Sequence, residues 1–246
     1  MKKIFSVILL LLPMALLAQD VTTIKSPKHR VAMLELYTSE GCSSCPPADI
    51  FLTELKAKGI SEQQLIPMAF HVTYWDYIGW KDRFAQQRFD QRQRERASQN
   101  KQHTVYTPQF IFSGEDYRRS ASFSNDVDEL VRQKASVDLE LTADRQSDKL
   151  WLKLKADISG SKHKNIGFYF VLLEDNLFSE VKDGENQGER LQHDYVVRQF
   201  MGPYFQLQSE QTIVMLPEWK QQDLSIVAFA EDPKTGEVLQ AVRVKY

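Results

Sequence analysis

Apolar and polar residues divide the chain into two regions of different periodicity. In residues 31–135, short apolar runs typical of buried strands alternate with segments whose apolar residues recur at helical spacing. Strands and helices are predicted in alternation, starting with a strand, over residues 31–37, 48–59, 65–72, 82–99, 108–114 and 124–135. Such an alternation is typical of an α/β layer fold.

The second region, from about residue 137, has the pattern of strands without convincing helices. Six or seven short strands are predicted, and turn sequences such as "DRQSDK" and "DPKTGE" separate them. The candidate strands cover residues 136–144, 149–159, 166–175, 194–202, 211–217, 224–232 and 237–246. We therefore expect an α/β domain at residues 19–136 and an antiparallel, sandwich-like β domain at 137–246, with the two domains packed together.

The first 18 residues have the composition of a secretory signal peptide. A basic start, "MKK", precedes the apolar stretch "IFSVILLLLPMALLA", and Ala18 offers a small residue at the expected cleavage site. A membrane anchor is the alternative, but a span needs roughly 20 apolar residues, and Pro13 interrupts this stretch. We expect cleavage after residue 18 and a secreted or periplasmic protein without a stable membrane anchor.

The net charge and the length of the chain argue against nucleic-acid binding and against a purely structural role for the cysteines. The formal net charge is −2, and loss of the signal peptide removes two lysines, so the basic footprint of a nucleic-acid-binding protein is missing. A chain of 246 residues buries enough apolar surface to fold without disulfides. Its only two cysteines, Cys42 and Cys45, enclose too short a loop to stabilise the fold much. A purely structural disulfide is therefore the weakest explanation for the pair.

The Cys42–Cys45 pair lies between a predicted strand and a predicted helix. Free N–H groups and the helix dipole at a helix start favour a thiolate, so we expect a depressed pKa and a nucleophilic role for Cys42. Cys45 would then resolve a mixed disulfide by attacking Cys42. A carboxylate close to Cys42 has the opposite effect on its pKa, and Glu40 is the candidate for it.

Thr107 and Pro108 come directly before the predicted strand at 108–114. A proline that opens a strand removes no ladder hydrogen bond, and X-Pro is the one peptide bond that adopts the cis form at modest cost. In thioredoxin-like folds, a cis-proline in this place lies opposite the C-x-x-C pair and presents backbone to the substrate. The sequence thus resembles the thioredoxin superfamily, which implies a cis Thr107–Pro108 bond and substrate contacts there.

A closer resemblance is to an exported, thioredoxin-like family named domain of unknown function 1223. The matching blocks are "LYTSEGCSSCPPAD", "FHVTYWDYIGWKDRFA", "VYTPQ" and "GENQGERLQHDYVVR". This resemblance implies a thioredoxin-like fold and a redox role, although the family has no settled activity. Ordinary thioredoxins carry Trp before the first cysteine and Gly-Pro between the pair, where this chain has Gly41 and Ser43-Ser44. The resemblance therefore does not predict the reduction potential of the Cys42–Cys45 pair, nor whether the pair oxidises or reduces its substrate.

Three further residues near the pair allow more than one interpretation. Trp75 belongs to an aromatic segment that either grips a substrate beside the cysteines or packs in the core. Asp76 is either a proton acceptor for Cys45 or a solvated turn residue. His71 is either a hydrogen-bonded strand residue or, with Cys42 and Cys45, the third ligand of a copper or zinc ion.

Together these features predict an exported thiol–disulfide oxidoreductase that needs no cofactor. Its substrate would be a protein or small-molecule thiol or disulfide, and an exported reductase would also need a membrane redox partner. Two alternatives stay open. One is a copper or zinc delivery protein that uses Cys42, Cys45 and His71, and the other is a binding module with a vestigial disulfide and little solvent access to Cys42.

Overall fold

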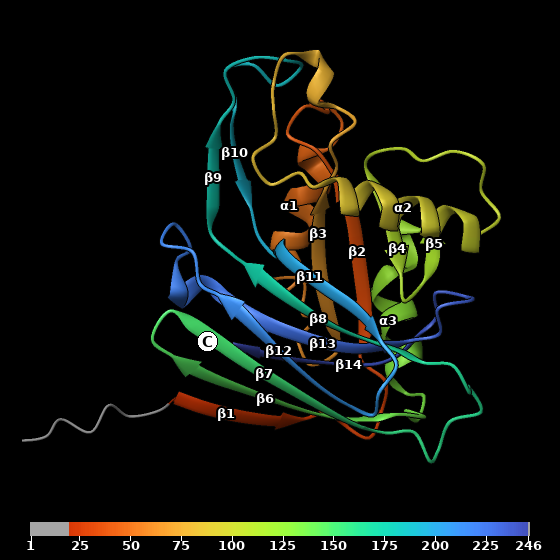
Figure 1. Cartoon of the computed structure of the whole chain (residues 1–246). Helices are drawn as coiled ribbons and strands as arrows, with labels where there is room; N and C mark the ends of the chain where they lie inside the picture. Colours follow the sequence, from red (N-terminus) through yellow and green to blue (C-terminus); the bar gives the residue numbers. More distant parts are fainter. Residues whose placement is uncertain (1–19, 246) are drawn as a thin grey trace, which may run out of the picture.

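The computed structural model describes residues 20–245, and its largest element is an eight-stranded sheet (Figure 1). The strand order is β14-β13-β8-β11-β3-β2-β4-β5. Their bounds are β2 Ala32–Thr38, β3 Leu65–His71, β4 Gln109–Phe112, β5 Glu115–Tyr117, β8 Gly167–Glu174, β11 Val196–Tyr204, β13 Leu224–Glu231 and β14 Val238–Lys245. The predicted strands at 31–37, 65–72 and 108–114 are confirmed as β2, β3 and β4. Those predicted at 166–175, 194–202, 224–232 and 237–246 are confirmed as β8, β11, β13 and β14.

One pair of strands joins the two regions of the chain into this single sheet. β11 runs parallel to β3, with Val196 opposite Ala69, and the N–H of Ala69 donates to the carbonyl of Tyr195 at 2.8 Å. β2, β3, β8 and β13 are buried along their whole length, as expected for strands that are covered on both faces.

The expected fold class, an α/β thioredoxin-like domain followed by a separate β sandwich, is therefore wrong. Most of the regular structure is strand, and the largest sheet takes four strands from each region. The periodicity of β3 correctly predicts a buried strand, but it carries no information about the partner at its edge. If the first domain were separate, the edge of β3 that faces away from β2 would need another hydrogen-bond partner. Here β11 is that partner.

A second, four-stranded sheet packs against one part of the large sheet. Its order is β1-β6-β7-β12, with bounds β1 Asp20–Lys25, β6 Asp138–Gln146, β7 Lys149–Asp157 and β12 Gln208–Val214. Leu141 and Leu152 from this sheet share a buried core with Phe170 and Ile226 from the large one. β1 comes from the first region and pairs with β6, and the sequence pattern did not reveal it.

Three α-helices within residues 20–245 cover the part of the large sheet that contains β2 and β3. They are α1 Pro46–Glu54, α2 Gln87–Gln99 and α3 Phe123–Val131, and all three lie within predicted helices or within two residues of one. Leu52 of α1 and Val127 of α3 pack on one face. Phe89 of α2 packs on the other face, edge-on to Phe70 of β3 with ring centroids 5.2 Å apart.

Charged residues of α2 enter the core rather than facing water. The side chains of Arg92 and Arg96 are at most 5% exposed, and they form ion pairs with Glu35 of β2 and Glu231 of β13. Glu35 also accepts a hydrogen bond from the hydroxyl of Tyr37 at 2.7 Å. This buried ionic network connects strands from both regions of the chain through one helix.

A two-stranded hairpin stands beside α1 at the end of the large sheet (Figure 1). It consists of β9 Leu177–Glu180 and β10 Arg190–His193, joined by a loop over residues 181–189. The expected signal peptide, residues 1–18, lies outside the described residues. No helix within residues 20–245 combines the length and apolarity needed to cross a membrane.

Candidate functional site

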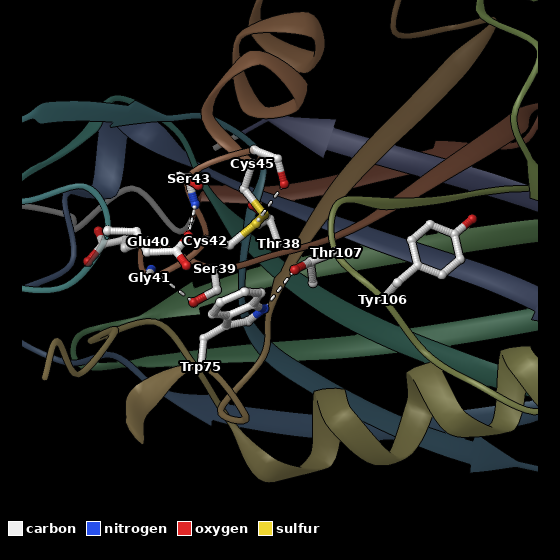
Figure 2. Close-up of a disulfide and its surroundings, with 12 residues drawn as sticks. Thr38, Ser39, Glu40, Gly41, Cys42, Ser43, Cys45, Trp75, Tyr106 and Thr107 are labelled. Atoms are coloured by element: carbon white, nitrogen blue, oxygen red, sulfur yellow. Dashed lines mark hydrogen bonds between the residues drawn. A yellow bond between two sulfur atoms is a disulfide. The ribbon is translucent and has the colours of Figure 1, made fainter. Parts of the chain in front are cut away.

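Cys42 and Cys45 form a disulfide in the turn between β2 and α1 (Figure 2). Their Cα atoms are 5.4 Å apart, and the N–H of Cys45 donates to the carbonyl of Cys42 at 3.1 Å. The Sγ atom of Cys42 lies 3.4 Å from the hydroxyl of Ser44. Cys42 is only 1% exposed and Cys45 is fully buried, so the pair is shielded from solvent.

The first turn of α1 offers few free donors to the disulfide. Cys45 is the N-cap, and Pro46 and Pro47 follow it without N–H groups of their own. The N–H groups of Ala48 and Asp49 donate to the carbonyl of Cys45 at 2.8 and 3.2 Å. The helix therefore begins after Cys42, and helix stabilisation of a Cys42 thiolate stays a prediction.

The 181–189 loop covers the backbone of the cysteine turn. The buried amide of Asn186 donates to the carbonyls of Glu40 and Cys42 at 2.8 and 3.1 Å. The carboxylate of Glu185 accepts the N–H of Ser43 at 2.9 Å. Gly184 sits so close to Ile78 that a Cβ would meet its Cδ1 at 3.2 Å. The loop thus connects the hairpin to the cysteine turn and to the segment that contains Ile78.

We expect Asn186→Ala to make the disulfide easier to reduce. The substitution removes two hydrogen bonds, each worth about 1 kcal/mol, so states in which the loop is open should be about thirtyfold more populated. The measurement is the rate of reduction by excess dithiothreitol, followed by thiol alkylation. Asn165→Ala, at an exposed position, is the control and should leave the rate unchanged. Equal rates for Asn186→Ala and wild type would show that the loop does not limit access.

Two residues that were predicted to contact substrate lie together near the disulfide (Figure 2). The indole N–H of Trp75 donates to the hydroxyl of Thr107 at 2.7 Å. Thr107 and Pro108 are joined by a cis peptide bond, which confirms that prediction. All three residues are partly exposed, and Tyr77, which is 81% exposed, stacks on Trp75. The partly exposed surface beside the buried pair is thus aromatic and polar.

The two carboxylates named from the sequence occupy different settings. The carboxylate of Glu40 is buried and points away from the disulfide (Figure 2). It accepts the indole N–H of Trp80 at 2.7 Å. Asp76 begins the short 3-10 helix Asp76–Ile78 and accepts the N–H of Asp82 at 3.2 Å. Partial burial raises the pKa of Asp76, and its role as a proton acceptor for Cys45 stays a prediction.

Beneath the cysteine turn lies a buried cluster of two histidines and three carboxylates, formed by Glu40, Asp49, His71, Asp82 and His193. Nδ1 of His71 lies 2.6 Å from Asp82 Oδ2, and Nε2 of His193 lies 3.2 Å from Glu40 Oε1. The two imidazole rings meet edge to face with centroids 4.9 Å apart. The N–H of Glu40 donates to Asp82 at 2.9 Å, which links the two halves of the cluster.

Opposite charges offset the cost of burial in this cluster. Burial opposes charge on His193, but the carboxylates of Asp49 and Glu40 outweigh it and raise the pKa of His193 to about 10. Burial likewise opposes charge on Glu40 and Asp82. Hydrogen bonding to His193 nevertheless lowers the pKa of Glu40, and the adjacent His71 lowers the pKa of Asp82. The cluster therefore favours ionised carboxylates on Glu40 and Asp82 and a protonated His193.

Sequence reasoning named Glu40 and His71 but missed the other members of this cluster. Asp49 was read only as part of a helix, and Asp82 as the start of another. His193 carried one signal, because it lies in the block "GENQGERLQHDYVVR" that contributes to the family resemblance. The structure brings His71 together with Asp49 and His193, while Cys42 and Cys45 are joined to each other.

Comparison with family models identifies one family. The family described as "Protein of unknown function (DUF1223)" matches residues 33–231. Its match includes the cysteine turn, both histidines of the buried cluster and the 181–189 loop. None of the curated proteins matches the chain.

The solved structures that share the fold over most of the chain include two from different bacteria. A crystal structure of a protein from Agrobacterium tumefaciens is 21% identical, with a TM-score of 0.63, and the match covers 89% of this chain and 96% of that one. HBP35 of Porphyromonas gingivalis is 12% identical, with a TM-score of 0.67 and coverage of 89% and 76%. At such low identity these matches describe the fold and not the activity.

Proposed function

The chain belongs to the family described as protein of unknown function DUF1223, and we propose that it is an exported protein that exchanges thiols and disulfides through Cys42 and Cys45. The Cys42 thiolate attacks a substrate disulfide, a Cys42–substrate disulfide forms, and the other substrate sulfur leaves as a thiolate that takes up a proton. The Cys45 thiolate then attacks Cys42, which reforms the Cys42–Cys45 disulfide and releases the second substrate thiol. The substrate gains two electrons and the pair loses them, and the reverse sequence oxidises a substrate dithiol.

The observation that carries this proposal is the disulfide between the only two cysteines of the chain, at the start of α1. A disulfide that closes so short a loop contributes little to stability, which leaves its chemistry as the reason for it. Trp75 and Thr107, near the pair, offer an aromatic face and a hydroxyl to a substrate. Access to the sulfurs requires local opening, since Cys42 is 1% exposed, and the segment that we expect to move is the 181–189 loop, which is bonded to the backbone of the cysteine turn.

Export, partners and cofactor requirement are parts of the same proposal. The apolar N-terminal stretch supports passage into an oxidising compartment, where a cysteine pair can cycle between dithiol and disulfide. The substrate is a protein or small-molecule thiol or disulfide, and no cofactor is needed because both electrons reside on the sulfurs. A protein that works as a reductant there also needs a membrane partner to supply electrons.

Single cysteine variants test the exchange reaction. In Cys42→Ser, exchange with a disulfide-containing peptide should fall to the rate of the uncatalysed reaction, because the attacking sulfur is lost. In Cys45→Ser, a mixed disulfide between Cys42 and the peptide should accumulate, because no sulfur remains to resolve it. Mass spectrometry of the alkylated protein distinguishes the two variants. If both variants exchanged at the wild-type rate, the proposal would be wrong.

The burial of Cys42 favours a second candidate, a non-catalytic binding module with a vestigial disulfide. In that case reduction by dithiothreitol should be slow in wild type, and reduced protein should not transfer electrons to any peptide disulfide. The exposed aromatic ring of Tyr77, stacked on Trp75, would then contribute to a binding surface. Peptide-exchange rates measured on the wild-type chain and on Asn186→Ala decide between the two candidates.

A further inference from the structure

The buried cluster beneath the cysteine turn contains two imidazole nitrogens without a partner. Nε2 of His71 and Nδ1 of His193 are buried and have no hydrogen-bond partner among the described residues. Buried polar atoms are almost always paired, because desolvation without a hydrogen bond costs about 1–3 kcal/mol. Two such atoms in facing rings, with centroids 4.9 Å apart, therefore indicate a missing partner common to both.

The other nitrogen of each ring is held in the way that is typical of metal ligands. Nδ1 of His71 lies 2.6 Å from the carboxylate of Asp82, and Nε2 of His193 lies 3.2 Å from that of Glu40. A histidine that binds a metal usually donates its second N–H to a carboxylate, which fixes the tautomer and orients the ring. Nε2 of His71 and Nδ1 of His193, the nitrogens left without a hydrogen bond, are thus the ones available to a metal ion, which would replace any proton on them.

A third donor comes from α1. One oxygen of Asp49, Oδ2, accepts the hydroxyl of Thr38 at 3.0 Å, while Oδ1 faces His193 Nδ1 at 3.9 Å. Donor atoms of Asp49, His71 and His193 all lie within 4.8 Å of one another. In a tetrahedral zinc site the ligand atoms are about 3.4 Å apart, so side-chain rotation has to bring these donors closer by roughly 1 Å.

We propose that Asp49, His71 and His193 form a binding site for a divalent transition-metal ion, best matched by Zn²⁺. Two imidazoles and one carboxylate are ligands that suit Zn²⁺. Within residues 20–245, no lysine or arginine pairs with Glu40, Asp49 or Asp82, and their only cationic partners are the two histidines that a metal ion would use as ligands. The ion would tie α1, β3 and β10 together directly below the disulfide, without using either sulfur.

Zinc content after refolding tests this site. The protein, purified without a histidine tag, is refolded with zinc chloride at neutral pH because its ligands are buried, and excess metal is removed by gel filtration. We expect about one zinc ion per chain by mass spectrometry of the metal, and a higher melting temperature than for chain refolded with chelator. A wild-type protein that retains no zinc after this treatment would overturn the proposal.

Matched variants separate loss of a ligand from loss of the fold. In His71→Asn the amide can still donate to Asp82, and in His193→Gln it can still donate to Glu40, but the metal-facing nitrogen is gone. We expect each variant to fold by circular dichroism and to retain less than about a tenth of the wild-type zinc. His163→Gln, which changes a histidine paired with Asp232 elsewhere, should bind zinc like wild type. Wild-type zinc content in both cluster variants would also overturn the proposal.

A cysteine-free variant keeps this test independent of the proposed redox function. The double variant Cys42→Ser, Cys45→Ser cannot exchange disulfides, yet it should still bind about one zinc ion, because neither sulfur is a ligand. When cobalt(II) is bound to the wild-type chain in place of zinc, the spectrum should show no thiolate charge-transfer absorption in the near ultraviolet. Zinc binding that disappears in the double variant would assign the metal to the cysteines and overturn the site proposed here.

Discussion

Replacement of Arg96 by methionine is expected to lower the free energy of unfolding by about 3–5 kcal/mol, because it removes one partner from a buried ion pair. The guanidinium of Arg96 donates to Glu35 at 2.7 Å and to Glu231 at 2.5 Å. It also donates to the carbonyl of Gly236 at 3.1 Å. Methionine fills a similar volume but leaves both carboxylates with Arg92 alone.

The measurement is urea unfolding of the oxidised protein, followed by circular dichroism. Arg94→Met is the matched control, because Arg94 lies on the exposed face of the same helix, and it should change stability by less than about 0.5 kcal/mol. Two variants of equal stability would contradict the prediction, since they would show that the buried network contributes no more than a solvated arginine.

Acid should destabilise the fold through Glu35 in the same network. Burial opposes its charge, but Arg92 and Arg96 outweigh burial and lower the pKa of Glu35 from 4.5 to about 2. Because the folded pKa lies below that of the unfolded chain, the stabilisation is complete above about pH 4.5 and is lost as the pH falls toward 2. The shift corresponds to about 3 kcal/mol.

Urea unfolding at a series of pH values between 5 and 2 measures this dependence. In Glu35→Gln the stability at neutral pH should already be low, and its fall between about pH 4.5 and 2 should be smaller than in wild type. Glu54→Gln, at a half-exposed pair with Lys58, should keep the wild-type profile. A Glu35→Gln variant with the wild-type acid dependence would assign the effect to other carboxylates.

Local structure was largely predictable from the sequence, because local patterns determine it. The apolar run before the cysteines became β2, and the segment at 124–135 with helical spacing became α3. The short strands β9 and β10 were missed because each has only four residues, and polar side chains, Ser179 in β9 and His193 in β10, stand at buried positions. α2 was predicted in place, but Arg92 and Arg96 look like solvent-facing residues unless the buried glutamates that they meet are known.

Long-range pairing explains why the fold class was wrong and why three of the five residues in the buried cluster were overlooked. No local pattern states that β3 pairs with β11, and without that pair His71 and His193 have no reason to be close. The cysteine turn, the cis Thr107–Pro108 bond and Trp75 were identified because each lies in a short motif. His193 and Asp82 became recognisable only when the hairpin and the cysteine turn were placed side by side.

The pairing of β3 with β11 also has a consequence for the order of events during synthesis. Ala69 leaves the ribosome long before Val196, its partner across the sheet, and contacts so distant in sequence make folding slow. β13 and β14, which complete the sheet, are made last of all. A growing chain therefore cannot finish its central sheet, and it should remain unfolded until nearly the whole polypeptide has been made. An unfolded precursor is the form that a protein-conducting channel can pass through a membrane.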